Sequence, residues 1–197
     1  MKLSINEASQ LIQQRQSLYP AQMQAGEKIP DADIWKLLEN ANYAPSHKRT
    51  EPWRYIVFSG DALHHFFEEM GKIYQQITPQ EEVNASKIEK FKTKAAILSH
   101  LIAICMKRDE KEQVPIEEEE YSVAASVQNM LLSMKPLNII GYWGTGKIAF
   151  SKEMKSYLNL GEKDKCMGFL QLGVPKEGLP EISKKQMSPI QDKVEWR

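Results

Sequence analysis

The amino-acid sequence predicts an α+β protein with a central mixed β-sheet flanked by helices. Segments with apolar residues at helical spacing are interspersed with short β-branched and aromatic runs, without the regular alternation that a βαβ fold requires. The chain has 197 residues, of which 42% are hydrophobic. This length and composition are typical of one globular domain, so we expect a single domain over residues 1–197.

The first part of the chain predicts two helices. Ser4 and Glu7 form the S-x-x-E pattern of a capping box, which predicts a helix directly after them. A second helix is expected to begin at Asp31 or Asp33 and to end before Pro45. Its apolar residues lie at i, i+3, i+4 and i+7, namely Ile34, Leu37, Leu38 and Ala41.

The next segments predict a strand, two helices and a second strand. Residues 54–58 (RYIVF) are β-branched or aromatic and precede Ser-Gly, which is typical of a strand. A helix is expected over 61–77, capped by the aspartate at its start, and the charged segment 80–94 predicts a largely solvated helix. Residues 95–106 suit either a buried helix or a buried strand. A central strand is favoured over 101–106, where the run is nearly continuously apolar.

The clearest helical pattern covers residues 121–134. We expect a charged loop over 107–119, before this helix. The acidic run 117–120 lies at the N-terminal end of the helix, where the macrodipole favours negative charge, and this interpretation is preferred over a metal site. The apolar stripe of the helix comprises Val123, Val127, Met130, Leu131 and Met134.

The last part of the chain predicts short elements and a tail. In order, these are a strand over 138–143, a turn over 144–146, a small helix over 151–158 and a strand over 166–172. Residues 178–197 hold too few apolar side chains to fold on themselves. We therefore expect this tail to lie on another surface, such as a neighbouring subunit.

Charge and cysteine content restrict the partners and the compartment. The 26 basic and 26 acidic side chains cancel, which argues against nucleic acid or an anionic membrane as a partner. Residues 1–16 are polar and helix-like, unlike a secretory signal, and the apolar run 95–106 is too short to span a membrane. Cys105 and Cys166 lie in apolar contexts without metal-binding spacing. We interpret them as buried thiols and expect a cytoplasmic protein.

The common catalytic signatures are missing. The sequence has no G-x-G-x-x-G after a strand, no Walker loop, no G-x-S-x-G elbow and no H-E-x-x-H. His64 and His65 are adjacent on a predicted helix, where they point in different directions, and His100 is typical of a core residue. We therefore expect no metal site and no catalytic side chain. Any chemistry would come from an organic cofactor.

Three segments of the chain are unusual for a protein whose residues have only a structural role. They are residues 15–17 (RQS) at a helix end, residues 43–53 (YAPSHKRTEPW) in a loop between two prolines, and residues 142–146 (YWGTG). Taken singly, they are compatible with a solvated helix end, a rigid loop and a tight turn.

Together these segments resemble the FMN-dependent nitroreductase family, and the resemblance spans nearly the whole chain. The similar elements are RQS at 15–17 for R-R-S, Ala44-Pro45-Ser46 with Pro52-Trp53 for A-P-S…Q-P-W, Gln128-Asn129-Met130 followed by Trp143 for Q-N-M…G-x-W, and 168–175 for a late strand ending in G-x-P. The short chain and the A-P-x-H-K form of the second element are most similar to the compact branch of the family.

The resemblance implies a nitroreductase-like fold and a homodimer with two FMN molecules at the subunit interface. The C-terminal tail, residues 178–197, would embrace the partner subunit. NAD(P)H would donate electrons, and a small, planar, electron-poor molecule such as a nitroaromatic or a quinone would accept them. The flavin N5 would carry this ping-pong chemistry, so no catalytic side chain is implied.

The resemblance also assigns eight residues to the cofactor. Arg15 would pair with the FMN phosphate, since a guanidinium fork suits phosphate oxygens, with Gln16 and Ser17 beside it. The remaining contacts would be Tyr43 and His47, which reach the flavin from the partner chain, and Trp143, Gly144 and Thr145, which approach the isoalloxazine ring with backbone N–H groups near N5.

Several positions depart from the family pattern. They are Gln16 for the second arginine, Tyr19 for a third basic residue, Arg49 and Glu51 for asparagine and glutamine, and Gly144 for the arginine of related compact members. Lys193 or Arg197 is a candidate for the missing positive charge. The departures leave two alternatives open: a flavin-binding sensor or carrier dimer without efficient turnover, and a dimeric scaffold without a cofactor.

Overall fold

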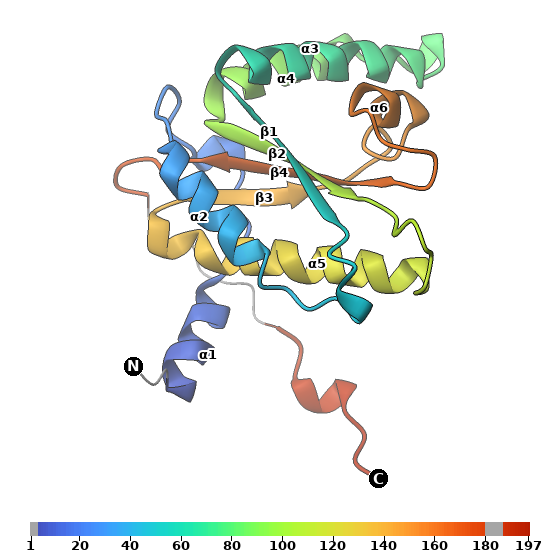
Figure 1. Cartoon of the computed structure of the whole chain (residues 1–197). Helices are drawn as coiled ribbons and strands as arrows, with labels where there is room; N and C mark the ends of the chain where they lie inside the picture. The colour runs from blue at the N-terminus through green and yellow to red at the C-terminus, as the bar shows by residue number, and fades with distance from the viewer. Residues whose placement is uncertain (1–3, 180–186) are drawn as a thin grey trace.

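The computed structural model describes residues 4–179 and 187–197 and has three layers (Figure 1). A four-stranded sheet lies between α3 (Gly60–Gln76), α4 (Ala85–Ile97) and α6 (Lys152–Tyr157) on one face, and α2 (Asp31–Ala41) and α5 (Ile116–Ser133) on the other. The predicted α+β class is confirmed. Within the described part of the chain, no helix is both long and apolar enough to cross a membrane.

The sheet has the strand order β1-β2-β4-β3. Its strands are β1 (Trp53–Ser59), β2 (His100–Met106), β3 (Ile140–Gly144) and β4 (Lys165–Gly173). Every pairing in the described chain is antiparallel, so the expectation of mixed pairing was wrong. The connections explain this result. The α3–α4 helix pair returns the chain to the end of the sheet at which β1 finished, so that the last residue of β1 pairs with the first residue of β2.

The central strand β2 is buried along its whole length. Its residues point alternately to the two faces, with Leu101, Ala103 and Cys105 on the α3 side and Ile102 and Ile104 on the α5 side. The predicted strand over 101–106 is therefore confirmed, while the first residues of the ambiguous run complete helix α4. Residues 95–106 suited both a helix and a strand because the buried end of α4 and the buried strand β2 follow each other within this one apolar run.

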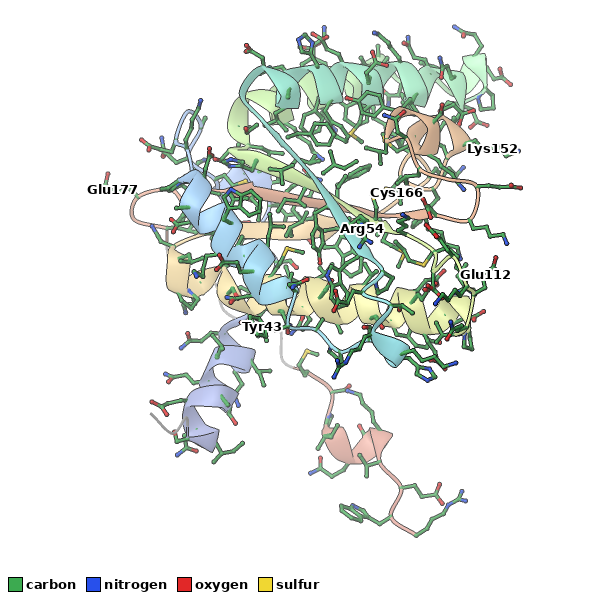
Figure 2. The ribbon with its side chains drawn as sticks, viewed as in Figure 1. Tyr43, Arg54, Glu112, Lys152, Cys166 and Glu177 are labelled. Atoms are coloured by element: carbon green, nitrogen blue, oxygen red, sulfur yellow. The ribbon has the colours of Figure 1, made fainter. Side chains whose placement is uncertain are left out.

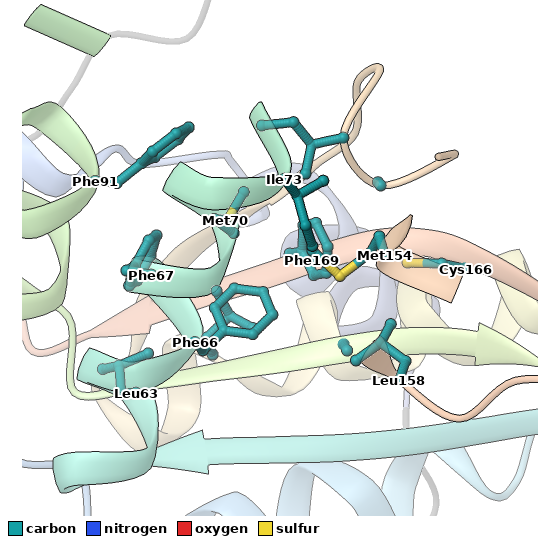
Figure 3. Packing of buried hydrophobic residues seen from close by; sticks show 14 of the residues in the cluster. Leu63, Phe66, Phe67, Met70, Ile73, Phe91, Met154, Leu158, Cys166 and Phe169 are labelled. Carbon is teal, nitrogen blue, oxygen red and sulfur yellow. The ribbon is translucent and has the colours of Figure 1, made fainter. Parts of the chain in front are cut away.

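Two hydrophobic cores hold the layers together. The core below α3, α4 and α6 is rich in aromatic rings, and Figure 3 shows Phe66 among its neighbours. The ring centroid of Phe66 lies 5.2 Å from that of Phe169 and 5.6 Å from that of Phe67, in edge-on arrangements that stabilise aromatic pairs. The second core is mostly aliphatic, and Val123, Val127 and Met130 of α5 enter it as the sequence stripe predicts.

Most predicted elements are present, with corrected boundaries. The Ser4–Glu7 capping box is confirmed: Glu7 N donates to Ser4 Oγ at 3.2 Å and Ser4 N donates to Glu7 Oε2 at 2.8 Å. Helix α1 (Ile5–Gln14) buries none of its residues. The predicted cap at Asp61 was wrong, because α3 already begins at Gly60. The charged segment 80–94 forms a short 3-10 turn followed by α4, whose N-cap is Asn84.

Helix α5 begins at Ile116, so the prediction of a loop through 119 was wrong. The reason is a buried ion pair. Glu119 is fully buried and accepts from Arg108 Nη1 at 2.5 Å and from the backbone N of Asp109 at 3.0 Å. Arg108 also donates to the carbonyl of Val114 at 2.8 Å. This pair joins the residues after β2 to the first turn of α5, where the acidic run lies as expected.

Substituting Glu119 tests the contribution of this pair. Glu119→Gln should lower the free energy of unfolding by more than a surface control, because the buried carboxylate that pairs with Arg108 becomes a neutral amide. Glu120→Gln is the matched control, since Glu120 pairs with Lys165 at the surface and should contribute no more than about 1 kcal/mol. Urea denaturation measures both values. Equal stabilities of the two variants would contradict the assignment.

A second polar cluster joins α2 to the sheet. His100 is 3% exposed, its Nδ1 lies 2.8 Å from Ser99 Oγ, and its Nε2 lies 3.5 Å from Asp31 Oδ1. Ser99 Oγ also accepts from Ile29 N at 2.7 Å. Burial lowers the pKa of His100 below its ordinary value of 6.5, and this effect exceeds the opposing attraction of Asp31.

This lowered pKa predicts a stability that depends on pH. Below pH 6.5 the unfolded chain binds a proton at His100 that the folded chain does not bind. The free energy of unfolding should therefore decrease as the pH is lowered, by up to about 1.4 kcal/mol per pH unit. A His100→Gln variant lacks this proton. Denaturant titrations from pH 7.5 to 5 should therefore show a steeper loss in the wild type, and parallel losses would refute the account.

Candidate functional site

Alternate residues of β3 point to opposite faces of the sheet. Trp143 packs into the core on the α5 side and its Nε1 donates to the carbonyl of Met167 at 2.9 Å. This contact needs Gly168, whose φ is +114°, because a Cβ there would lie 2.8 Å from Trp143 Nε1 and 2.5 Å from the carbonyl oxygen of Gly144. The two glycines and the indole therefore fix the end of β3 against β4.

A cavity of about 310 Å³ opens on the other face of β3. Its floor is the end of β3 with the following turn, and α3 and α4 contribute its walls. The lining combines aromatic rings, charged groups and glycines, namely Tyr74, Phe91, Tyr142, Phe169, Glu82, Lys87, Lys94, Lys147, Gly144, Thr145 and Gly146. Of the eight residues assigned to the cofactor, Gly144 and Thr145 lie on this cavity.

Gly144 lies where the cavity floor is too crowded to take a side chain easily. A Cβ at this position would lie 3.1 Å from the ring of Tyr142 and 3.4 Å from Nε2 of Gln171. Gln171 is 7% exposed and lines the cavity, and its Oε1 is buried without a hydrogen-bond partner in the described chain. A buried amide oxygen without a partner is costly, so a donor from a bound molecule or a water would stabilise Gln171.

The segment that follows α1 lies beside β3. Leu18 N donates to the carbonyl of Gly141 at 3.0 Å, and the ring of Tyr19 lies 4.8 Å from that of Tyr142. Lys94 Nζ donates to the hydroxyl of Tyr142 at 3.2 Å. Contacts of Tyr142 with Tyr19 and with Lys94 therefore connect the segment after Ser17 to the cavity.

The structure places the first three candidate residues just before this row. Arg15 is the C-cap of α1 and is half-buried, as is Gln16, whereas Ser17 is exposed. The two candidates for extra positive charge at the C-terminus have contacts of their own: Lys193 donates to the carbonyl of Ser188 at 3.3 Å, and Arg197 Nε lies 3.0 Å from Glu195 Oε1.

The loop between the two prolines lies on α5, away from the cavity. His47 Nδ1 is hydrogen-bonded to a carboxylate oxygen of Glu118, and Tyr43, at the end of α2, is 86% exposed (Figure 2). Three non-glycine residues of this loop, Lys48, Arg49 and Glu51, have φ between +44° and +55°. One chain alone therefore brings neither Tyr43 nor His47 to the cavity, and it holds their loop in a strained conformation.

The two thiols face each other across the sheet. Cys105 of β2 and Cys166 of β4 are paired residues, and both are buried, as the sequence predicts. A hydrogen bond with Cys166, together with burial, raises the pKa of the Cys105 thiol above its usual range. Cys105 is therefore protonated at neutral pH and is a core residue rather than a nucleophile.

Sequence reasoning missed Lys94 and Gln171 as site residues, and it gave no role to Tyr142 within the segment 142–146. Lys94 belongs to a segment that its charge marked as solvated, but it lies three positions after the buried Phe91 and one before the buried Ala95. That spacing places it at the edge of the buried face of α4 and was the available signal. The signal for Gln171 was a polar residue within an otherwise apolar strand.

Comparisons with known proteins agree with this architecture. The model of the family described as the nitroreductase family matches residues 12–174. The Bacillus subtilis protein YfhC, provisionally named an NAD(P)H nitroreductase, is 28% identical over 172 residues, which cover 85% of this chain and 84% of YfhC.

Two solved structures show the same fold. A nitroreductase-like protein from Bacillus cereus has a TM-score of 0.80 at 20% identity, with 100% of this chain and 99% of that chain covered. A provisionally assigned nitroreductase from Desulfovibrio desulfuricans, in complex with FMN, has a TM-score of 0.71 at 19% identity, with 98% of each chain covered. With a family match over most of its length and a shared fold, the chain belongs to the nitroreductase family.

Proposed function

We propose that this protein is an FMN-dependent NAD(P)H:acceptor oxidoreductase that reduces nitroaromatics, quinones or similar planar, electron-poor molecules by a ping-pong mechanism. The observation that carries the proposal is that Leu18, directly after Arg15–Ser17, bonds to β3, and that Gly144 and Thr145 at the end of β3 line a cavity. The family match and the NAD(P)H nitroreductase name of YfhC support the same reaction class.

The residues along β3 fit FMN. Arg15 would hold the phosphate through its guanidinium fork, with Gln16 and Ser17 as further hydrogen-bonding groups. The carbonyl of Gly141 points outward to Leu18, and by the alternation of an antiparallel ladder the backbone N–H of Trp143 points to the same outer side. That N–H is a donor for the ring edge.

The cavity fits the flat part of such a cofactor. Gly144 brings no side chain to the floor, aromatic rings form the walls, and the unsatisfied Oε1 of Gln171 would accept a hydrogen bond from the cofactor. When bound, FMN would supply hydride chemistry at N5. The protein's own contribution is to orient the ring, to exclude water with the α3–α4 wall, and to present positive charge from Lys94 where electrons accumulate.

A homodimer would complete the site. The side chains of α1 and of the C-terminal segment leave large apolar groups exposed, including Ile5 at 79%, Ile12 at 58%, Ile190 at 63% and Trp196 at 93%. Figure 1 shows both segments projecting from the body of the molecule. Such surfaces are typical of subunit contacts. In the proposed dimer the tail, residues 178–197, embraces the partner. Residues 180–186 of this tail lie outside the described residues.

Exposed groups on the α5 side support contacts between the two chains. Tyr43 is exposed just after α2, and His47 is hydrogen-bonded to Glu118 of α5. Neither residue lines the cavity of its own chain. In the dimer they would reach the flavin bound by the partner subunit. The strained loop is consistent with this role, since strain is concentrated at ligand contacts.

The proposal is tested on the purified protein saturated with FMN. We expect a flavin band at about 450 nm, a dimeric mass in solution, and bleaching by NADH or NADPH under anaerobic conditions that a nitroaromatic or a quinone reverses. A carrier or sensor would bind FMN but bleach slowly. A protein that binds no flavin, or that oxidises neither nicotinamide with any acceptor, would exclude the proposed reaction.

The phosphate contact gives a second prediction. Arg15→Ala should weaken FMN binding by about 1.5–3 kcal/mol, the value of one charged hydrogen-bonded contact, whereas Arg15→Lys should lose less because it keeps the charge. Quenching of flavin fluorescence measures both affinities. Riboflavin, which has no phosphate, is the control ligand, and its affinity should be the same in all three proteins. An Arg15→Ala variant with wild-type FMN affinity would remove Arg15 from the site.

A further inference from the structure

We propose that Cys166 is an oxidation site, at which hydrogen peroxide converts the thiol to a sulfenic acid and Cys105 then closes a disulfide between β2 and β4. The proposed flavin chemistry uses neither thiol, so this inference does not depend on the proposed function. The chain has two cysteines in total, so a disulfide within one chain can only join this pair.

A bulge in the sheet brings the two sulfur atoms together. Ile104 pairs with Gly168, and an uninterrupted ladder would then pair Cys105 with Met167. The register shifts by one residue at this point, so that Cys105 pairs with Cys166 instead. Met167 packs on the α5 side, whereas both cysteines belong to the core on the α3 side, in which Figure 3 shows Cys166.

This pairing has the geometry that a disulfide requires. The Cα atoms of residues directly opposite in an antiparallel ladder are about 4.5–5.5 Å apart, within the range of about 4.4–6.8 Å that disulfides span. The two thiols already share a hydrogen bond. A bond between the sulfur atoms therefore needs little movement of either strand.

The two thiols differ in access. Cys105 is 0% exposed, and it lies on the central strand. Cys166 is 5% exposed and lines a second cavity, of about 570 Å³, between the residues around the start of α6 and the start of β4. A small reagent such as hydrogen peroxide can therefore meet Cys166 but not Cys105.

The hydrogen bond between the thiols favours the same order of reaction. The Cys105 thiol donates to Cys166, which lowers the pKa of Cys166 below its ordinary value even though burial opposes the effect. The same bond raises the pKa of Cys105. Cys166 therefore ionises first, and the thiolate is the form that peroxides oxidise.

The reaction has two steps. In the first, the Cys166 sulfur attacks one oxygen of hydrogen peroxide, the O–O bond breaks, and the departing hydroxide takes up the proton that the thiol released, which gives water. In the second, the Cys105 sulfur attacks the sulfur of the sulfenic acid. The S–S bond forms, the S–O bond breaks, and the proton of Cys105 leaves with the hydroxyl group as a second water.

The second step follows from the first. While Cys166 is a thiolate, its hydrogen bond is the main reason that Cys105 keeps its proton. Once Cys166 carries a hydroxyl group, this charge is gone and the Cys105 proton is easier to remove. The disulfide also protects Cys166 from further, irreversible oxidation to the sulfinic acid.

The test treats the reduced, folded, full-length protein with hydrogen peroxide, with and without FMN. Both thiols should disappear together when they are titrated after quenching and denaturation, and dithiothreitol should restore both. A peptide map without reductant should show Cys105 joined to Cys166. Because the thiols are measured directly, the result stands even if the protein binds no flavin.

Two variants separate the roles of the thiols. In Cys166→Ser, the remaining Cys105 should react at least about tenfold more slowly than the wild-type thiols, because it is buried and protonated. Cys105→Ser keeps a hydrogen-bond donor beside Cys166, so it should form a sulfenic acid that dimedone labels and should form no disulfide. If a buried hydroxyl prevents folding, Cys105→Ala should give the same label.

Three results would overturn the inference. The first is a wild type whose two thiols survive peroxide or whose disulfide joins two chains on a non-reducing gel. The second is a Cys166→Ser variant that loses its remaining thiol at the wild-type rate, which would make Cys105 the oxidised residue. The third is a wild type in which Cys166 becomes a sulfinic acid while Cys105 stays reduced.

Discussion

The architecture depends on the burial of one strand. β2 is covered on both faces and paired on both edges, and six of its seven residues are at most 1% exposed. A strand in this position needs a layer of helices on each side, since neither face can meet water. The α3–α4 pair and the α2–α5 pair supply these layers. Their two cores differ in character, because the aromatic residues of α3, α4 and β4 gather on one side and the aliphatic residues of α2 and α5 on the other.

This arrangement also determines where a ligand can bind. With β2 and β4 inside the sheet, β3 is an edge strand, and its outer side meets the segment after α1. The cavity forms where the α3–α4 layer ends above this edge. Groups far apart in the sequence, such as Lys94 and Gln171, meet there because each flanks a buried position on its own element. The site is thus a product of the same packing that buries the centre of the sheet.

Local patterns predicted most of the elements, and long-range contacts explain the errors. The capping box at Ser4, the stripe on α5 and the strand over 101–106 follow from spacing alone. The start of α5 does not, because it depends on Arg108, a partner eleven positions before Glu119. The candidate site residues came from family motifs, which name Arg15, Trp143 and Gly144 but not Lys94 or Gln171, which line the cavity beside Gly144. Lys94 looked like a solvated charge, and only the packing of α4 reveals that it borders a cavity.

The open edge of β3 has a consequence for the empty protein. Leu18 bonds to the carbonyl of Gly141 on that side, and peptide groups of an edge strand that stay unpaired can bind an extended chain, which is a common route to aggregation. Here the strand is only five residues long and contains two glycines, both of which weaken such pairing. These two features limit association between the edges of different copies of the chain, while the same edge stays accessible to a ligand.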